Sequence, residues 1–196
     1  MVAATLTPWR RWFPAVRWLI AVILLAALSA CEEPLPPLKI RIGESVPPLS
    51  VRDLRQQPAT LKPSPDRLLM INVWATWCGP CRHEMPSLQR LAQRLGEERL
   101  ELVGLSVDGD EHVVREYLIE NGITFPSLLD SDLSEVFGVL GVRVYPSTFF
   151  VRPDGTLVKV VEGWREWDAP ALVESIEALL PPPLSAPTVV QGAGQD

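Results

Sequence analysis

The sequence predicts an α/β domain in which a mixed sheet is flanked by helices and followed by a C-terminal β-hairpin and a final helix. Apolar runs of strand length, at 68–74 and 100–107, are each followed by a segment with helical periodicity. Near the C-terminus, the pair Asp154-Gly155 separates two further strand-like runs, as in a tight hairpin turn. Strands that alternate with helices favour a mainly parallel sheet, to which the hairpin adds an antiparallel edge.

The first half of the domain is predicted from three segments. A short strand at 49–53 is followed by a loop that contains several prolines. The run 68–74 is almost entirely apolar, as expected for a central strand that is covered on both faces. After Cys78, apolar residues recur at helical spacing until Gly96, a typical helix stop, and Pro86 is expected to kink this helix.

The second half of the domain continues the alternation of strands and helices. The sequence predicts, in order, a strand at 100–107, a helix at 111–120, a strand at 125–129, a short helix at 133–137, strands at 147–151 and 156–162, and a helix at 169–180. Asn121-Gly122 ends the first of these helices, and Pro181 ends the last. The predicted domain therefore spans 49–180.

The first 30 residues differ from the rest because they hold three arginines and no acidic residue. The apolar run 18–30 has 13 residues, which suits a signal-peptide core better than the roughly 20 residues of a membrane-spanning helix. Its end, Leu28-Ser-Ala-Cys31, resembles the lipobox of bacterial lipoproteins, whose cysteine is lipidated. We expect 1–30 to be a signal peptide and Cys31 to carry a lipid. An uncleaved anchor helix with an unmodified Cys31 is the alternative, and both place the domain outside the cytoplasm, tethered to a membrane.

The segments on either side of the predicted domain lack its regular apolar pattern. Residues 31–48 contain five prolines without sustained periodicity, as in a spacer, and 181–196 are predicted to form a disordered tail.

The net charge is −6, and because the first 30 residues contribute +3, the remainder carries −9. We do not expect an acidic domain without a run of Lys or Arg to bind nucleic acid, because such binding depends on neutralising phosphates.

The motif Cys78-Gly79-Pro80-Cys81 lies between the predicted central strand and the helix that follows it. Unpaired backbone N–H groups at a helix N-terminus stabilise a thiolate and lower the thiol pKa from about 8.5. Cys78 is therefore the predicted nucleophile. Cys81, one turn later and more buried, is the predicted resolving cysteine, which attacks a mixed disulfide and releases the partner. Pro80 suits the first helical turn, where its missing N–H would have no partner.

A zinc site and a purely structural disulfide are the alternative interpretations of this motif. Structural zinc is bound by four ligands, and a single Cys-x-x-Cys with two histidines elsewhere in the sequence falls short of a zinc motif. A disulfide that closes so short a loop contributes little entropy, so stabilisation alone is a weak explanation. The sequence therefore predicts no metal and no cofactor beyond a redox-active Cys78–Cys81 disulfide.

Two longer segments carry a family resemblance. Trp74-Ala-Thr-Trp-Cys-Gly-Pro-Cys-Arg-His-Glu-Met-Pro86 and Gly141-Val-Arg-Val-Tyr-Pro-Ser-Thr-Phe-Phe-Val151 resemble the corresponding segments of membrane-tethered thioredoxin-like proteins of the TlpA/ResA/DsbE type. The similarity extends over about 43–180. It implies a thioredoxin-like fold with a thiol-disulfide oxidoreductase site.

The resemblance also implies a substrate-binding surface around the cysteines. Pro146 matches a cis-proline that packs against the disulfide in such proteins, and the backbone of Val144 and Tyr145 matches the segment that pairs with a substrate. Trp77 joins this expected surface, together with the two residues between the cysteines, Gly79 and Pro80.

The chain differs from cytoplasmic thioredoxins in the residue that could transfer protons near the cysteines. Asn72 stands where cytoplasmic thioredoxins carry a buried aspartate, and an amide cannot exchange protons in that role. Glu84, three residues after Cys81, matches the carboxylate that ResA-like proteins keep near the thiols. Because this spacing places it beneath Cys81, we expect Glu84 to move protons for that thiol; a helix-surface acid in an ion pair is the alternative. Trp164 and Trp167 are expected to pack in the core.

The functional hypothesis is a membrane-tethered, extracytoplasmic thiol-disulfide oxidoreductase that reduces cysteine pairs of client proteins. Gly-Pro between the cysteines is shared with thioredoxin, at about −270 mV, which favours reduction by analogy. The resemblance implies electrons from a membrane thiol donor and clients such as apocytochrome c or a copper-oxidase subunit.

The alternatives to this hypothesis are a general disulfide oxidant, an isomerase, a peroxiredoxin and a copper-delivery module. The peroxidatic cysteine of a peroxiredoxin lies in a local sequence pattern that Thr76-Trp-Cys78 does not match. A copper carrier of the Sco type has cysteines separated by three residues and a distal histidine, which Cys78 and Cys81 do not match.

Overall fold

The computed structural model describes residues 39–182. The predicted signal segment 1–30, Cys31 and the tail from 183 onward therefore lie outside the described residues. The elements are β1 (Leu49–Arg52), β2 (Pro58–Leu61), β3 (Leu68–Trp74), α2 (Gly79–Leu95), β4 (Leu100–Ser106), α3 (Glu111–Glu120), β5 (Ser127–Leu129), η2 (Val136–Leu140), β6 (Ser147–Val151), β7 (Leu157–Glu162) and α4 (Pro170–Glu177).

The strands form a seven-stranded mixed sheet in the order β2-β1-β5-β4-β3-β6-β7. Only the neighbours β3–β4 and β4–β5 are parallel, whereas β1–β2, β1–β5, β3–β6 and β6–β7 are antiparallel. The expectation of a mixed sheet with helices and a closing hairpin is confirmed. The expectation that the sheet is mainly parallel is wrong, because β6 runs antiparallel beside the central strand and β1 runs antiparallel beside β5.

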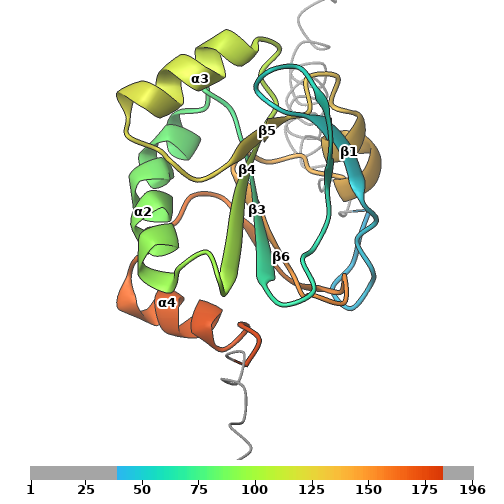
Figure 1. Ribbon diagram of the computed structural model, residues 1–196, viewed down its shortest axis with the longest axis vertical. Helices are drawn as coiled ribbons and strands as arrows, with labels where there is room; N and C mark the ends of the chain where they lie inside the picture. Colours follow the sequence, from blue (N-terminus) through green and yellow to red (C-terminus); the bar gives the residue numbers. More distant parts are fainter. Residues whose placement is uncertain (1–38, 183–196) are drawn as a thin grey trace, which may run out of the picture. The chain divides into compact units, whose positions relative to one another are not determined.

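The central strand β3 is buried along its whole length, as its apolar sequence predicts. Two successive crossovers, β3–α2–β4 and β4–α3–β5, progress through the sheet in the same direction. Since parallel crossovers are almost always right-handed, they place α2 and α3 on the same face of the sheet. Figure 1 shows α2, α3 and α4 together on this side, so that α2 begins at the edge where β3 ends.

Three local features differ from the sequence-based expectation. The proline-containing loop includes a strand, β2, which pairs with β1. The short helix starts near the predicted residue, at 134, but continues through η2 to Leu140 instead of ending at 137. The buried carboxylate of Asp130 accepts hydrogen bonds from the backbone N–H groups of Glu135 and Val136 in its first turn. The last helix is shorter, at Pro170–Glu177.

The segment before β1 packs on the closing hairpin. The backbone N–H of Gly43 donates to the Leu157 carbonyl (2.8 Å), and that of Val46 donates to the Gly155 carbonyl (2.9 Å). Ile40 and Val46 are buried. The packed part of the chain therefore begins within the segment that the prolines suggested to be a spacer. Within residues 39–182, no helix combines the length and the apolar character needed to cross a membrane.

Candidate active site

The two cysteines of the motif are joined by a disulfide at the N-terminus of α2. Cys78 is the N-cap residue, and its sulfur accepts a hydrogen bond from the backbone N–H of Cys81 (3.2 Å). The helix N-terminus therefore faces the Cys78 sulfur, where it stabilises negative charge. Cys78 is 6% exposed and Cys81 is 0% exposed, so only the first cysteine of the pair reaches the surface. This geometry favours Cys78 as the nucleophile and Cys81 as the resolving cysteine, and these roles stay predictions.

A buried carboxylate fixes the loop that leads into the motif. Asp108 follows β4 and accepts hydrogen bonds from the backbone N–H of Thr76 (2.9 Å), the Thr76 hydroxyl (2.7 Å) and the Ser106 hydroxyl (2.7 Å). Asp108 was not among the site residues predicted from the sequence. The sequence does contain a signal for Asp108. This residue follows a buried parallel strand, and the carboxyl end of that strand lies at the same sheet edge as Cys78. Asp108 therefore holds the backbone two residues before the nucleophile.

We expect Asp108→Ala to lower the free energy of unfolding by about 2–4 kcal/mol, because three buried or half-buried donors lose a charged acceptor. Asp110→Ala is the control, since Asp110 only caps α3 through the His112 N–H and should cost about 1 kcal/mol. Urea unfolding of the disulfide form would measure both values. Equal losses in the two variants would contradict the special role of Asp108.

The residues expected to meet a substrate differ in exposure: Val144 and Tyr145 are half-buried, and Pro146 is buried. Trp77 is 66% exposed, and its ring packs edge-on against Tyr145 with 5.9 Å between ring centroids. Gly79 and Pro80 are exposed as well. The peptide bond between Tyr145 and Pro146 is cis, as the resemblance implies.

One backbone acceptor of this surface already has a partner within the chain. The Ser147 hydroxyl donates to the Val144 carbonyl (2.7 Å). A carbonyl oxygen has a second lone pair, so Val144 keeps the capacity to accept a further bond from a substrate.

Glu84 is completely buried and hydrogen-bonded on both carboxylate oxygens. Oε1 accepts from the Asn72 amide (2.7 Å), and Oε2 accepts from the Trp167 indole N–H (2.9 Å) and the Arg165 backbone N–H (3.0 Å). Burial raises the pKa of Glu84, and the three hydrogen bonds offset part of this rise. The alternative of a helix-surface acid is therefore wrong. Glu84 and Cys81 lie three residues apart on α2, both fully buried.

The two C-terminal tryptophans have different environments. Trp167 is buried, as expected, and bonds to Glu84. Trp164 is 47% exposed and packs edge-on against the exposed His83, with 4.7 Å between ring centroids. The expectation that Trp164 lies in the core is wrong, because its ring packs on a surface residue of α2 instead.

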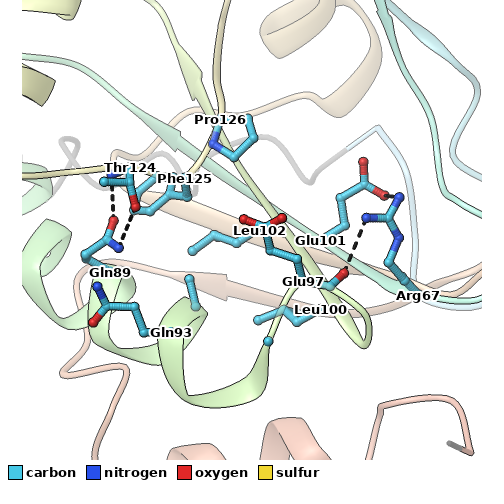
Figure 2. A pocket seen from close by; sticks show the side chains of 12 residues that line it. Arg67, Gln89, Gln93, Glu97, Leu100, Glu101, Leu102, Thr124, Phe125 and Pro126 are labelled. Atoms are coloured by element: carbon cyan, nitrogen blue, oxygen red, sulfur yellow. Dashed lines mark hydrogen bonds and ion pairs between the residues drawn. The ribbon is translucent and has the colours of Figure 1, made fainter.

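A pocket of about 300 Å³ lies at the other end of the sheet from the disulfide. Figure 2 shows its lining, in which Gln89 and Thr124 exchange two hydrogen bonds and Arg67 bonds to Glu101. The lining comes from the C-terminal half of α2 and the beginnings of β4 and β5, whereas Cys78 follows the end of β3. This pocket is therefore separate from the disulfide.

A disulfide at the start of a helix, in a thioredoxin-like fold with a cis-proline loop, defines a thiol-disulfide oxidoreductase. Enzymes of this class exchange disulfides with cysteine-containing proteins. The chain belongs to the AhpC/TSA family, whose model matches residues 42–160.

Individual relatives and solved structures agree with this class. The chain is 32% identical over 150 residues to the thiol-disulfide oxidoreductase ResA of Oceanobacillus iheyensis, which covers 74% of this chain and 76% of the relative. ResA of Bacillus subtilis is 29% identical over 121 residues, or 62% of this chain and 67% of the relative.

Among solved structures, a thioredoxin-family thiol:disulfide interchange protein from Chlorobium tepidum matches with a TM-score of 0.55 and 25% identity. The match covers 70% of this chain and 97% of that one. The thioredoxin domain of a thiol-disulfide oxidoreductase from Bacteroides vulgatus matches with a TM-score of 0.59 and 19% identity, over 71% and 98% of the two chains. This second likeness concerns the fold alone.

Proposed function

We propose that the protein is a disulfide reductase that acts on client proteins outside the cytoplasm while tethered to the cell membrane. The observation that carries this proposal is the asymmetry of the cysteine pair. The slightly exposed Cys78 lies at the helix N-terminus, and the buried Cys81 lies one turn later on the same helix as a buried acid, Glu84. An exposed attacking thiol with a protected second thiol is suited to opening a disulfide and then releasing the product.

The reaction proceeds in two exchange steps. The Cys78 thiolate attacks one sulfur of the client disulfide, so that a mixed disulfide forms and the other client sulfur leaves as a thiolate. Glu84 in its carboxylate form accepts the Cys81 proton, and the Cys81 sulfur attacks Cys78. The second client thiolate leaves, and the Cys78–Cys81 disulfide remains. Both client thiolates take up protons, so two electrons and two protons pass to the client.

A dithiol donor must then reduce the Cys78–Cys81 disulfide by the reverse of these steps. We propose that this donor is a membrane protein with a cysteine pair, because the N-terminal sequence predicts that the domain is held at the membrane. We propose as clients the proteins whose two cysteines must be reduced before they receive haem or copper. The similarity to ResA and to thiol:disulfide interchange proteins supports the chemistry of this proposal.

A redox titration against dithiothreitol tests the direction of the reaction. We expect a midpoint near the thioredoxin value of about −270 mV, and a value near the −120 mV of strong oxidants would contradict the proposal. Reduction of a peptide disulfide closed by Cys-x-x-Cys-His should proceed with the reduced protein. The same protein alkylated at Cys78 is the matched control and should be inactive.

The membrane tether gives a separate prediction. If Cys31 is lipidated, the mature chain should begin at Cys31 and partition with membranes, and Cys31→Ser should release it into the soluble fraction. Mass spectrometry of the N-terminus and fractionation of the host cells would measure both outcomes. An intact N-terminus at Met1, with membrane association that Cys31→Ser does not change, would favour the uncleaved anchor helix.

A further inference from the structure

The loop between β7 and α4 is bonded to α2 beside the buried acid. Both the Arg165 backbone N–H and the Trp167 indole N–H donate to Oε2 of Glu84. The Trp167 backbone N–H donates to the Ser87 hydroxyl (3.0 Å). Arg90, further along α2, pairs with Glu166 and Asp168. The loop therefore holds Glu84 at Oε2, while Asn72 of β3 holds it at Oε1.

The two oxygens of Glu84 are not equivalent. Oε2 receives two N–H donors, which occupy both of its lone-pair directions, whereas Oε1 receives one, from the Asn72 amide. A proton can therefore bind at Oε1 without displacing a donor from the loop. Asn72 can respond to this proton, because its own Oδ1 is buried and has no partner within residues 39–182. Rotation of the amide would turn Oδ1 toward Glu84, and the Thr148 hydroxyl, now 3.0 Å from the amide nitrogen, could donate to it.

We propose that Trp167 is a positioning residue for thiol-disulfide exchange, because its indole N–H fixes Oε2 and so directs proton exchange with Glu84 to Oε1. This inference rests on the proposed function, in which Glu84 accepts the Cys81 proton. The charged group that acts on Glu84 from the loop is Arg165, whose attraction lowers the pKa of the acid. The other groups bonded around it, Asn72 and Thr148, are neutral.

A second buried tryptophan provides a matched control. Trp74, the last residue of β3, is as completely buried as Trp167, but its indole N–H has no partner among the described residues. Replacement of either tryptophan by phenylalanine removes a similar volume from the core. Only Trp167→Phe removes a hydrogen bond to the Glu84 carboxylate.

The test measures the titration of the Glu84 carboxyl carbon by NMR in the disulfide form, in which neither cysteine titrates. Glu84→Gln identifies the resonance. Loss of a donor to the carboxylate disfavours its charged form, so Trp167→Phe should raise the midpoint by about one pH unit or more relative to Trp74→Phe. The pH profile of thiol exchange by the reduced protein should move upward by the same amount. A benzothienylalanine at position 167, which lacks the N–H but keeps the ring size, replaces Trp167→Phe if that variant does not fold.

The possible outcomes separate the positioning role from the proposed function. Parallel shifts of the NMR midpoint and the rate profile support the proposal. Equal midpoints in the Trp167 and Trp74 variants, or a shifted midpoint without a shifted profile, would overturn it while the wild type remains active. An unmodified protein that exchanges no disulfide would instead overturn the proposed function.

Discussion

Replacement of Cys81 by alanine is expected to turn the protein into a trap for its clients and to abolish multiple turnover. Cys78 can still open a client disulfide in this variant, but no second thiol can resolve the mixed disulfide. Cys78→Ala should trap few clients, because the remaining Cys81 sulfur is completely buried. Non-reducing electrophoresis and mass spectrometry after alkylation of live cells would count the trapped partners.

Two controls make this comparison specific. The linking cysteine of each trapped adduct should be mapped by mass spectrometry, so that adducts formed by Cys31 are not counted. The double variant Cys78→Ala/Cys81→Ala sets the background. Equal trapping by the two single-cysteine proteins would refute the assignment of Cys78 as nucleophile. Preferential trapping by Cys81 would reverse the two roles.

The sequence predicted those parts of the fold whose signals are local. The bounds predicted for β3, α3 and β6 agree with the structure, because each of these segments has its apolar pattern and its stop signals within a few residues. The short strand β2 and the antiparallel direction of β6 were not predicted from the residues. They depend on pairing with β1 and β3, segments that lie elsewhere in the chain, and no local pattern encodes a partner.

For the site as well, only the residues that lie close together in the sequence were predicted. The cysteine pair and Glu84 lie within seven residues on one helix, so their spacing is visible in the sequence. The groups that bind Glu84 come from distant segments: Asn72 is 12 residues away, and Trp167 is 83 residues away. Trp164 and Trp167 look alike in the sequence, yet only the second reaches the acid. The direction of a side chain after a turn depends on packing, which the sequence pattern does not reveal.

Replacement of Glu84 by glutamine is expected to slow disulfide exchange by about tenfold to a hundredfold, at the lower end of the usual effect of a general acid or base. In the wild type, the rate should rise as the pH increases through the raised pKa of Glu84, because only the carboxylate accepts the Cys81 proton. The variant should lack this step. Stopped-flow thiol exchange between pH 5 and 9 would measure both profiles, and superimposable profiles would exclude Glu84 from proton transfer.

Glu84→Gln should also change how the free energy of unfolding depends on pH. Because burial raises the pKa of Glu84 above its unfolded value of about 4.3, the folded protein keeps a proton that the unfolded chain has lost. This contribution to stability is fully present below pH 4.3 or so and is lost as the pH rises through the folded pKa. The free energy of unfolding of the disulfide form should therefore fall over this range in the wild type and fall less in Glu84→Gln. Glu120→Gln, at an exposed position on α3, is the control for a change of net charge and should follow the wild type. Urea unfolding at a series of pH values would measure the three curves, and a wild-type curve parallel to that of Glu84→Gln would show that the buried acid is not the group that titrates.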